Sequence, residues 1–168
     1  MAADRLPMTL AGVAKLKHEL KQLKTVERPK NVRDIEEARA HGDLSENAEY
    51  HAAKDKQGQI EGRTRFIEDI IARAEVIDVR KFDGDQVKFG ATVTLSDEET
   101  GNQMKYRIVG EFEADLKQRR VSITSPIARA LIGREVGDSV QVQAPGGAKE
   151  YEILSVEFIE DPAPEEGD

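Results

Sequence analysis

The chain has 168 residues, of which 38% are hydrophobic and 35% are charged. This charge fraction argues against a single large core and favours an extended helical element, whose surface is large for its volume. The absence of cysteine excludes disulfides and thiolate metal sites. No run reaches the length of a membrane span, and residues 1–15 lack the apolar core of a signal peptide. We therefore expect a soluble, cytoplasmic protein.

The net charge of -8 is concentrated in the second half of the chain. Residues 1–80 hold 15 Lys+Arg and 15 Asp+Glu, whereas residues 81–168 hold 10 and 18. A freestanding nucleic-acid binder usually carries a basic footprint, which is missing here. The charge distribution favours a protein partner, and we expect any direct DNA contact to be weak or indirect.

An amphipathic helix is predicted from Thr9, which suits an N-cap. Its apolar residues recur every three or four positions, close to a coiled-coil seam, at Leu10, Val13, Leu16, Leu20, Leu23 and Val26. Pro29 should kink or briefly break this helix, because proline has no amide hydrogen to donate. The stripe resumes at Val32, Ile35 and Ala38 and stops at Gly42.

A second helical pattern starts in the mid-forties. Its apolar positions are Ala48, Ala52, Ala53, Ile60, Phe66, Ile67, Ile70, Ile71 and Ala74. Two such helices joined by a short turn pack antiparallel and bury one stripe against the other. We therefore expect a coiled-coil hairpin over residues 1–78. At 1.5 Å per residue, the roughly 32 residues from Thr9 to Ala40 predict a rod about 48 Å long.

After residue 78 the hydrophobic period changes to two, which is typical of half-buried strands. Strands are predicted at Val87–Leu95, Met104–Ile108, Val121–Ile123, Val140–Val142 and Tyr151–Phe158. The last strand changes phase between Ile153 and Leu154, which indicates a β-bulge. "DEETGN" and "APGGA" predict hairpin turns, and "SPIARALIG" predicts one short helix that Ser125 caps.

The fold class is therefore α+β: the helical hairpin is followed by a small antiparallel β domain with a short helix, over residues 79–160. The acidic, proline-containing residues 161–168 are expected to be a disordered tail.

The densest acidic cluster, "HGDLSENAEYHAAKDKQG" over residues 41–58, falls at the bend of the hairpin. One interpretation is structural: Gly42 ends the first helix, Asp43 caps the second, and Glu46 completes a capping box. On sequence physics alone this interpretation is favoured. Yet a helix-helix turn does not require three acids, and carboxylates on a thin tip are open to an outside partner. Two or three of them would hold Mg²⁺ only weakly, so a partner would have to supply the remaining ligands.

Several motifs together resemble the bacterial Gre transcript-cleavage factors, and most closely their GreA type. The motifs are "MTLAGVAKLKHEL", "HGDLSENAEYHAAKDKQ", "VKFGATVTL", "YRIVG", "SPIARALIG" and "PGG". The resemblance covers about Met8 to Ile159. It implies that the hairpin enters the secondary channel of RNA polymerase, while an FKBP-like C-terminal domain docks at the channel rim. The factor then stimulates the polymerase to cleave the 3′ end of backtracked nascent RNA by a two-metal hydrolysis.

The resemblance also implies roles for individual residues, in an accessory factor rather than a complete enzyme. Asp43 and Glu46 match the carboxylates that help the polymerase to hold a shared Mg²⁺, and no metal is expected to bind stably to this chain alone. Supporting roles at the tip fall to Asn47, Glu49 and Tyr50, although Tyr50 suits packing across the hairpin at least as well. Arg39 and Lys54 match basic side chains that contact RNA, or else form part of a solvated helix face.

The short predicted helix matches the family's docking region at Ser125, Pro126 and Ile127. Capping and packing of that helix would explain the same three residues without a partner. We expect the chain to be a monomer.

Two rival functions remain open at this stage. Gre-like inhibitors of RNA polymerase use the same channel but carry altered acidic tips, whereas this tip keeps the D-L-S-E-N-A-E-Y form. A freestanding Mg²⁺ nuclease would need more ligands than the tip supplies.

Overall fold

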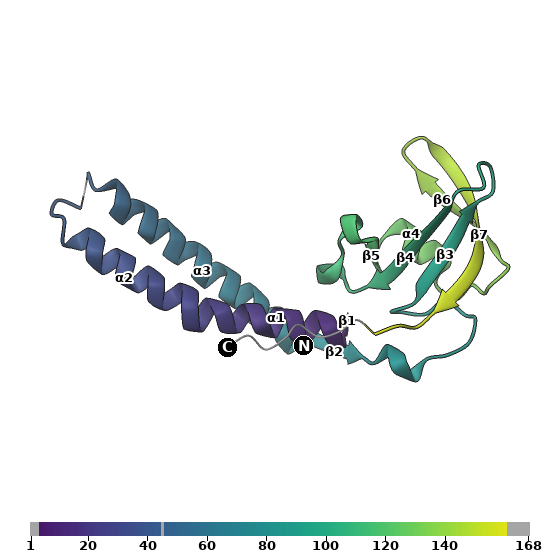
Figure 1. Ribbon diagram of the computed structural model, residues 1–168, viewed down its shortest axis with the longest axis horizontal. Helices are drawn as coiled ribbons and strands as arrows, with labels where there is room; N and C mark the ends of the chain where they lie inside the picture. The colour runs from purple at the N-terminus through teal and green to yellow at the C-terminus, as the bar shows by residue number, and fades with distance from the viewer. Residues whose placement is uncertain (1–3, 45, 161–168) are drawn as a thin grey trace. The chain divides into compact units, whose positions relative to one another are not determined.

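The computed structural model describes residues 4–44 and 46–160, which form two compact units (Figure 1). One unit is the hairpin, residues 13–44 and 46–73, and the other joins residues 4–12 to residues 74–160. This division differs from the expected boundary at residue 78, because β1 (Leu6–Thr9) pairs in parallel with β2 (Ala74–Ile77) and so lies with the second unit. The tail predicted to be disordered, residues 161–168, lies outside the described residues.

The hairpin consists of α1 (Leu10–Gln22), a π-helical segment (Leu23–Glu27), α2 (Arg28–Arg39) and α3 (Ala48–Arg73). In Figure 1, α3 returns alongside α2, as the sequence predicts for an antiparallel pair. The predicted stripe is buried at Val13, Ile35, Ala38, Ala53, Ile60, Ile67 and Ile70. The α+β fold class and the helical hairpin are confirmed.

A buried asparagine fixes how α2 and α3 align. Asn31 is 4% exposed, and its amide Nδ2 donates a hydrogen bond of 2.9 Å to the carbonyl oxygen of Ala53 on α3. A buried amide without a partner would be costly, so any other alignment of the two helices is penalised.

The predicted stripes are wrong at Phe66 on α3, which is 43% exposed, and at Val26 and Val32, which are 48% and 43% exposed. For Val26 and Val32 the reason is the π-helical segment, in which the amide of Arg28 reaches the carbonyl of Leu23 five residues earlier. Such a turn adds one residue and rotates the following face, so Asn31 rather than Val32 points into the hairpin. The segment ends one residue before the first turn of α2, where Pro29 lies. The backbone stays helical at Gln22, Glu27 and Arg28, so the predicted brief break at Pro29 is wrong, and a π-helical segment precedes the proline instead.

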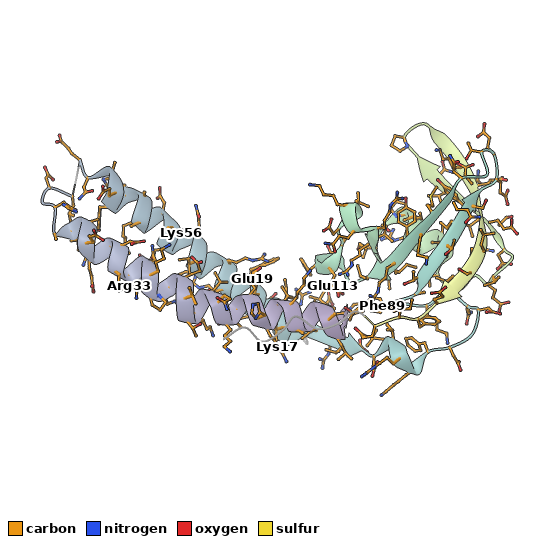
Figure 2. All side chains as sticks on the ribbon, viewed as in Figure 1. Lys17, Glu19, Arg33, Lys56, Phe89 and Glu113 are labelled. Atoms are coloured by element: carbon orange, nitrogen blue, oxygen red, sulfur yellow. The ribbon has the colours of Figure 1, made fainter. Side chains whose placement is uncertain are left out.

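Ion pairs link the helices on the surface of the hairpin. Arg63 meets Glu19 through two hydrogen bonds of 2.6 and 3.0 Å, and Figure 2 labels Glu19 on α1. Arg28 meets Glu61 in the same paired fashion at 2.9 and 3.1 Å. A third pair joins Lys24 to Glu68 at 2.8 Å. Exposed pairs of this kind each contribute little to the free energy of unfolding, because water and salt screen them.

The pair between Lys24 and Glu68 gives a pH-dependent prediction. The hydrogen bond and charge of Lys24 lower the pKa of the Glu68 carboxyl. Because the folded-state pKa is lowered, the contribution of this pair is present above about pH 4.3 and is lost as the pH falls through the folded value. Lys24→Met should raise the pKa of Glu68 toward its ordinary value in an NMR pH titration. The exposed Lys30→Met is the matched control and should leave that pKa unchanged.

The second unit is built around a five-stranded sheet of order β5-β4-β3-β7-β6. Its strands are β3 (Thr92–Asp97), β4 (Gln103–Val109), β5 (Arg120–Ser122), β6 (Ser139–Ala144) and β7 (Gly147–Glu157). The short helix α4 (Pro126–Leu131) packs Ala128 and Leu131 into the core of the sheet. The predicted bulge is confirmed, because β7 slips register where Thr94 faces Ser155 but Leu95 faces Ile153. Both predicted glycine turns are also present, with φ of +75° at Gly101 and +117° at Gly147.

The sheet departs from the sequence prediction in two places. It is mixed rather than wholly antiparallel, because β5 pairs in parallel with β4. Residues 110–119 form a crossover with two 3₁₀ turns, so the chain re-enters the sheet in the same direction. The predicted strand also begins at Thr92 and not at Val87, since Gly90 turns the chain with φ +85°. Val87, Phe89 and Ala91 are nevertheless buried.

Gly90 provides a stability prediction with an internal control. A Cβ at this position would overlap Cγ1 of the fully buried Val79, and the positive φ adds backbone strain. Gly90→Ala is therefore expected to lower the free energy of unfolding by about 2–4 kcal/mol in a denaturant titration. Gly84 has a similar φ of +90° but open space around it. Gly84→Ala should cost only about 1–2 kcal/mol, and equal losses would contradict the role of Val79.

Candidate functional site at the hairpin tip

The tip is the turn between α2 and α3, and its path is set by the end of α2. The amide of Ala40 still reaches the carbonyls of Glu36 and Glu37, both at 3.2 Å, and the amide of His41 reaches Ala38 at 3.2 Å. Gly42 then adopts φ +109°, a conformation that side chains with a Cβ rarely adopt. The predicted stop at Gly42 is thus correct as a turn, although the helix itself ends at Arg39.

Asn47 joins the two helices at this turn. Its side-chain oxygen accepts a hydrogen bond of 3.0 Å from the amide of Tyr50, which makes Asn47 the N-cap of α3. Its Nδ2 donates a hydrogen bond of 2.7 Å to the carbonyl of Ala38, one of the last carbonyls of α2. One half-buried side chain therefore satisfies a backbone group of each helix.

This geometry corrects the structural interpretation of the acidic cluster. Asp43 was expected to cap the second helix, with Glu46 completing a capping box, but α3 begins at Ala48 and its cap is Asn47. Asp43 and Glu46 instead lie in the turn and are exposed. Glu49, in the first turn of α3, is the one acid of the three placed to favour the helix dipole.

The acidic side chains line a common surface at the tip. An open depression of about 500 Å³ is bordered by His41, Asp43, Glu46, Asn47, Ala48 and Glu49. The structure therefore brings together four of the predicted tip residues, Asp43, Glu46, Asn47 and Glu49. Within the described residues, no group of three His, Asp or Glu side chains is arranged to hold a metal ion.

Tyr50 and the predicted basic residues lie beside this depression rather than in its lining. The guanidinium of Arg39 on α2 stands 5.9 Å from the centre of the Tyr50 ring on α3, within the range of a cation–π contact. This contact favours the interpretation of Tyr50 as packing across the hairpin. Lys54 is exposed and donates a hydrogen bond of 2.7 Å to Gln57, one turn along α3. Contact of Arg39 and Lys54 with RNA stays a prediction.

The predicted docking residues have clear structural roles in the sheet unit. The hydroxyl of Ser125 accepts the amide of Ala128 at 3.3 Å and so caps α4, while Pro126 occupies its first turn. Ile127 is half-buried and packs against the core of the sheet. These contacts account for all three residues without a partner, and their docking role stays a prediction.

Two asparagines that shape the hairpin and its tip were not recognised as such from the sequence. Asn31 was not singled out, because a polar residue between Pro29 and Val32 gives no sign of burial. Asn47 was assigned only a supporting role, although asparagine is among the best N-caps and directly precedes the alanine-rich run. That preference was the available signal for the true start of α3.

Two family models match successive parts of the chain. The first, described as "Transcription elongation factor, N-terminal", matches residues 6–76. The second, described as "Transcription elongation factor, GreA/GreB, C-term", matches residues 82–158. The chain belongs to the GreA/GreB family of transcription elongation factors.

The chain is similar to several individual proteins. The "Transcription elongation factor GreA" of Anaeromyxobacter sp. (strain K) is 65% identical over 98% of this chain and 99% of its own. The "Transcription elongation factor GreA" of Phenylobacterium zucineum (strain HLK1) is 62% identical over 93% of this chain and 99% of its own. Among solved structures, the GreA factor homolog 1 (Gfh1) protein of Thermus thermophilus is 26% identical over 91% of this chain and 99% of its own, with a TM-score of 0.41.

The named relatives bear on the rival functions left open by the sequence. The high identity to proteins named GreA favours an elongation factor, and the channel-binding inhibitor is not favoured. Within the part of the chain that the structure describes, no helix has both the length and the apolar character needed to span a membrane.

Proposed function

We propose that this chain binds RNA polymerase through its secondary channel and stimulates the polymerase's own Mg²⁺-dependent cleavage of backtracked RNA. It acts as an accessory factor that rescues arrested elongation complexes in the cytoplasm. The observation that carries the proposal is the placement of Asp43 and Glu46. Both are exposed in the turn, and the capping of α3 is done by Asn47 instead.

The chemistry of the tip fits a shared magnesium ion. Carboxylate oxygens are ligands that Mg²⁺ accepts, but the ion keeps its waters unless further ligands complete the octahedron. On this proposal Asp43 and Glu46 supply one side of the site and the polymerase supplies the rest. A Mg²⁺ ion held there by Asp43 and Glu46 together with the polymerase would supply charge neutralisation at the scissile phosphate and a bound water of lowered pKa. Asn47 holds the turn, and Glu49 adds negative charge to the same depression.

On this proposal the other predicted residues contact the RNA or the polymerase. Arg39 and Lys54 attract the phosphates of the extruded RNA, since electrostatic attraction dominates contacts with a nucleic-acid backbone. The surface around Ser125, Pro126 and Ile127 docks at the rim of the channel. Direct contact with DNA is not required, and the chain acts as a monomer.

The decisive experiment is RNA cleavage by a stalled, backtracked bacterial polymerase at fixed Mg²⁺, with and without this protein. We expect short 3′ fragments to be released faster when the protein is present, and the shortened RNA to be extended again on addition of nucleotides. No stimulation together with slowed nucleotide addition would instead identify a polymerase inhibitor. Cleavage of the same RNA without polymerase would identify a freestanding nuclease.

A further inference from the structure

A glutamate in the sheet unit reaches the first turn of α1. Glu113 ends the 3₁₀ turn Glu111–Glu113, in the crossover between β4 and β5. Its carboxylate accepts hydrogen bonds from the amide of Thr9 at 3.2 Å, from the hydroxyl of Thr9, and from the amide of Gly110 at 2.8 Å. Figure 2 labels this side chain. Thr9 and Glu113 are 104 positions apart in the chain, yet both belong to the same compact unit.

The hydroxyl of Thr9 connects this carboxylate to the helix. It accepts a hydrogen bond of 3.0 Å from the amide of Gly12, so Thr9 is the N-cap of α1, as the sequence predicts. A hydroxyl has one hydrogen to donate, and here Glu113 takes it, which leaves a lone pair directed at Gly12. The negative carboxylate also lies beside the positive end of the α1 dipole. Thr9 is 3% exposed, so water competes little for these bonds.

Two glycines make room for the carboxylate. A Cβ on Gly12 would overlap the side chain of Glu113, and a Cβ on Gly110 would overlap both the carbonyl oxygen of Pro7 and Oε2 of Glu113. Gly12 lies within α1, where glycine is a poorer helix former than any residue except proline. The helix therefore carries an unfavourable residue at the one position of its first turn that Glu113 approaches most closely. We call Thr9, Gly12, Gly110 and Glu113 the Glu113 network.

We propose that Glu113 is a positioning residue for the cleavage reaction. α1 starts at Leu10, inside the Glu113 network, and the helical chain runs on through the π-helical segment and α2 to the turn that carries Asp43 and Glu46. Because a helix is stiff, anchoring its first turn also steadies the helical residues that follow. The Glu113 network thereby helps to hold the tip carboxylates in place during cleavage. This inference rests on the proposed function.

The first test concerns the network itself and uses two changes with opposite expected signs. Helix propensity alone predicts that Gly12→Ala raises the melting temperature, whereas overlap with Glu113 predicts that it falls. Gly62, in α3, has nothing within 4 Å of an added Cβ, so Gly62→Ala is the matched control and should raise the melting temperature. Adding Glu113→Ala to Gly12→Ala removes the overlap. The double variant should therefore melt higher than the sum of the single effects predicts. Additive effects would overturn the network.

The second test separates positioning from mere folding, at a temperature where all variants are folded. Glu113→Ala should lower the maximal rate of stimulated cleavage by about 10-fold, while the factor concentration that gives half of that rate stays within about twofold. Glu113→Gln, which keeps one acceptor oxygen, should recover part of the rate. Glu111→Gln, in the same turn and exposed, should behave as wild type.

The outcomes distinguish the two proposals. A wild-type maximal rate for Glu113→Ala, with wild-type protein active, would overturn the positioning role alone. A failure of wild-type protein to stimulate cleavage would overturn the proposed function and the positioning role with it, even if the melting temperatures confirm the network.

Discussion

Asp43→Asn and Glu46→Gln are each expected to lower the rate of stimulated RNA cleavage by about 100-fold or more. Each substitution keeps the shape of the side chain and removes the negative charge that Mg²⁺ and its bound water require. The measurement is the rate of 3′ fragment release from a backtracked polymerase, at saturating factor and fixed Mg²⁺. Asp55→Asn removes the same charge from an exposed site in α3 and is the matched control.

Binding and melting measurements decide how a loss of cleavage is interpreted. The variants should still compete with wild-type protein for the polymerase, because the changed groups lie at the tip and the proposed docking surface lies in the sheet unit. If Asp43 capped α3, Asp43→Ala would lower the free energy of unfolding by about 1 kcal/mol. Since Asn47 is the cap, we expect a smaller loss. Normal cleavage by both amide variants would show that the tip carboxylates do not assist the metal.

The parts of the fold that were predictable from the sequence are those where a repeating pattern reports burial. The stripe of α3 is an example, since Ile60, Ile67 and Ile70 recur at helical spacing and are all buried. The bulge in β7 was visible in the same way, as a change of phase at Leu154. Each of these features is local, because the residues that reveal it are neighbours in the chain.

The errors in the predicted strands and helices arise at residues whose hydrophobic spacing does not match the backbone hydrogen bonding. Val87, Phe89 and Ala91 alternate like a strand and are buried like one, yet the turn at Gly90 keeps them out of the ladder. Likewise Val32 fits the helical stripe, but the π-helical turn before it rotates the face by one residue. Neither the partner strand nor the π-turn can be seen in hydrophobic spacing.

At the tip Asp43 was predicted to cap the second helix, and Asn47 was assigned only a supporting role. Asp43 with Glu46 matches a capping box, whereas Asn47 matches a simple N-cap four residues later. The deciding contact is the hydrogen bond from Asn47 to the carbonyl of Ala38 on the other helix. That contact depends on how the two helices align, and the buried Asn31 that fixes the alignment was itself not recognised.

Asn47→Ala is expected to loosen the tip while the rest of the hairpin stays folded. It removes the N-cap of α3 and the hydrogen bond to Ala38, each worth about 1 kcal/mol. A local loss of about 2 kcal/mol should speed hydrogen exchange of the Tyr50 amide roughly 30-fold, whereas the amide of Ile67, deep in α3, should exchange at its wild-type rate. Because the turn carries Asp43 and Glu46, we expect stimulated cleavage to fall by about 10-fold or more.

Asn47→Asp separates the two functions of this side chain. Aspartate keeps an oxygen that can accept the Tyr50 amide, but it has no hydrogen to donate to the Ala38 carbonyl. The Tyr50 amide should therefore stay largely protected, while cleavage falls, if the link between the helices is what positions the carboxylates. Cleavage at the wild-type rate by Asn47→Asp would mean that capping alone suffices. Cleavage at the wild-type rate by Asn47→Ala, together with faster hydrogen exchange of the Tyr50 amide, would mean that the tip acts without being held in place.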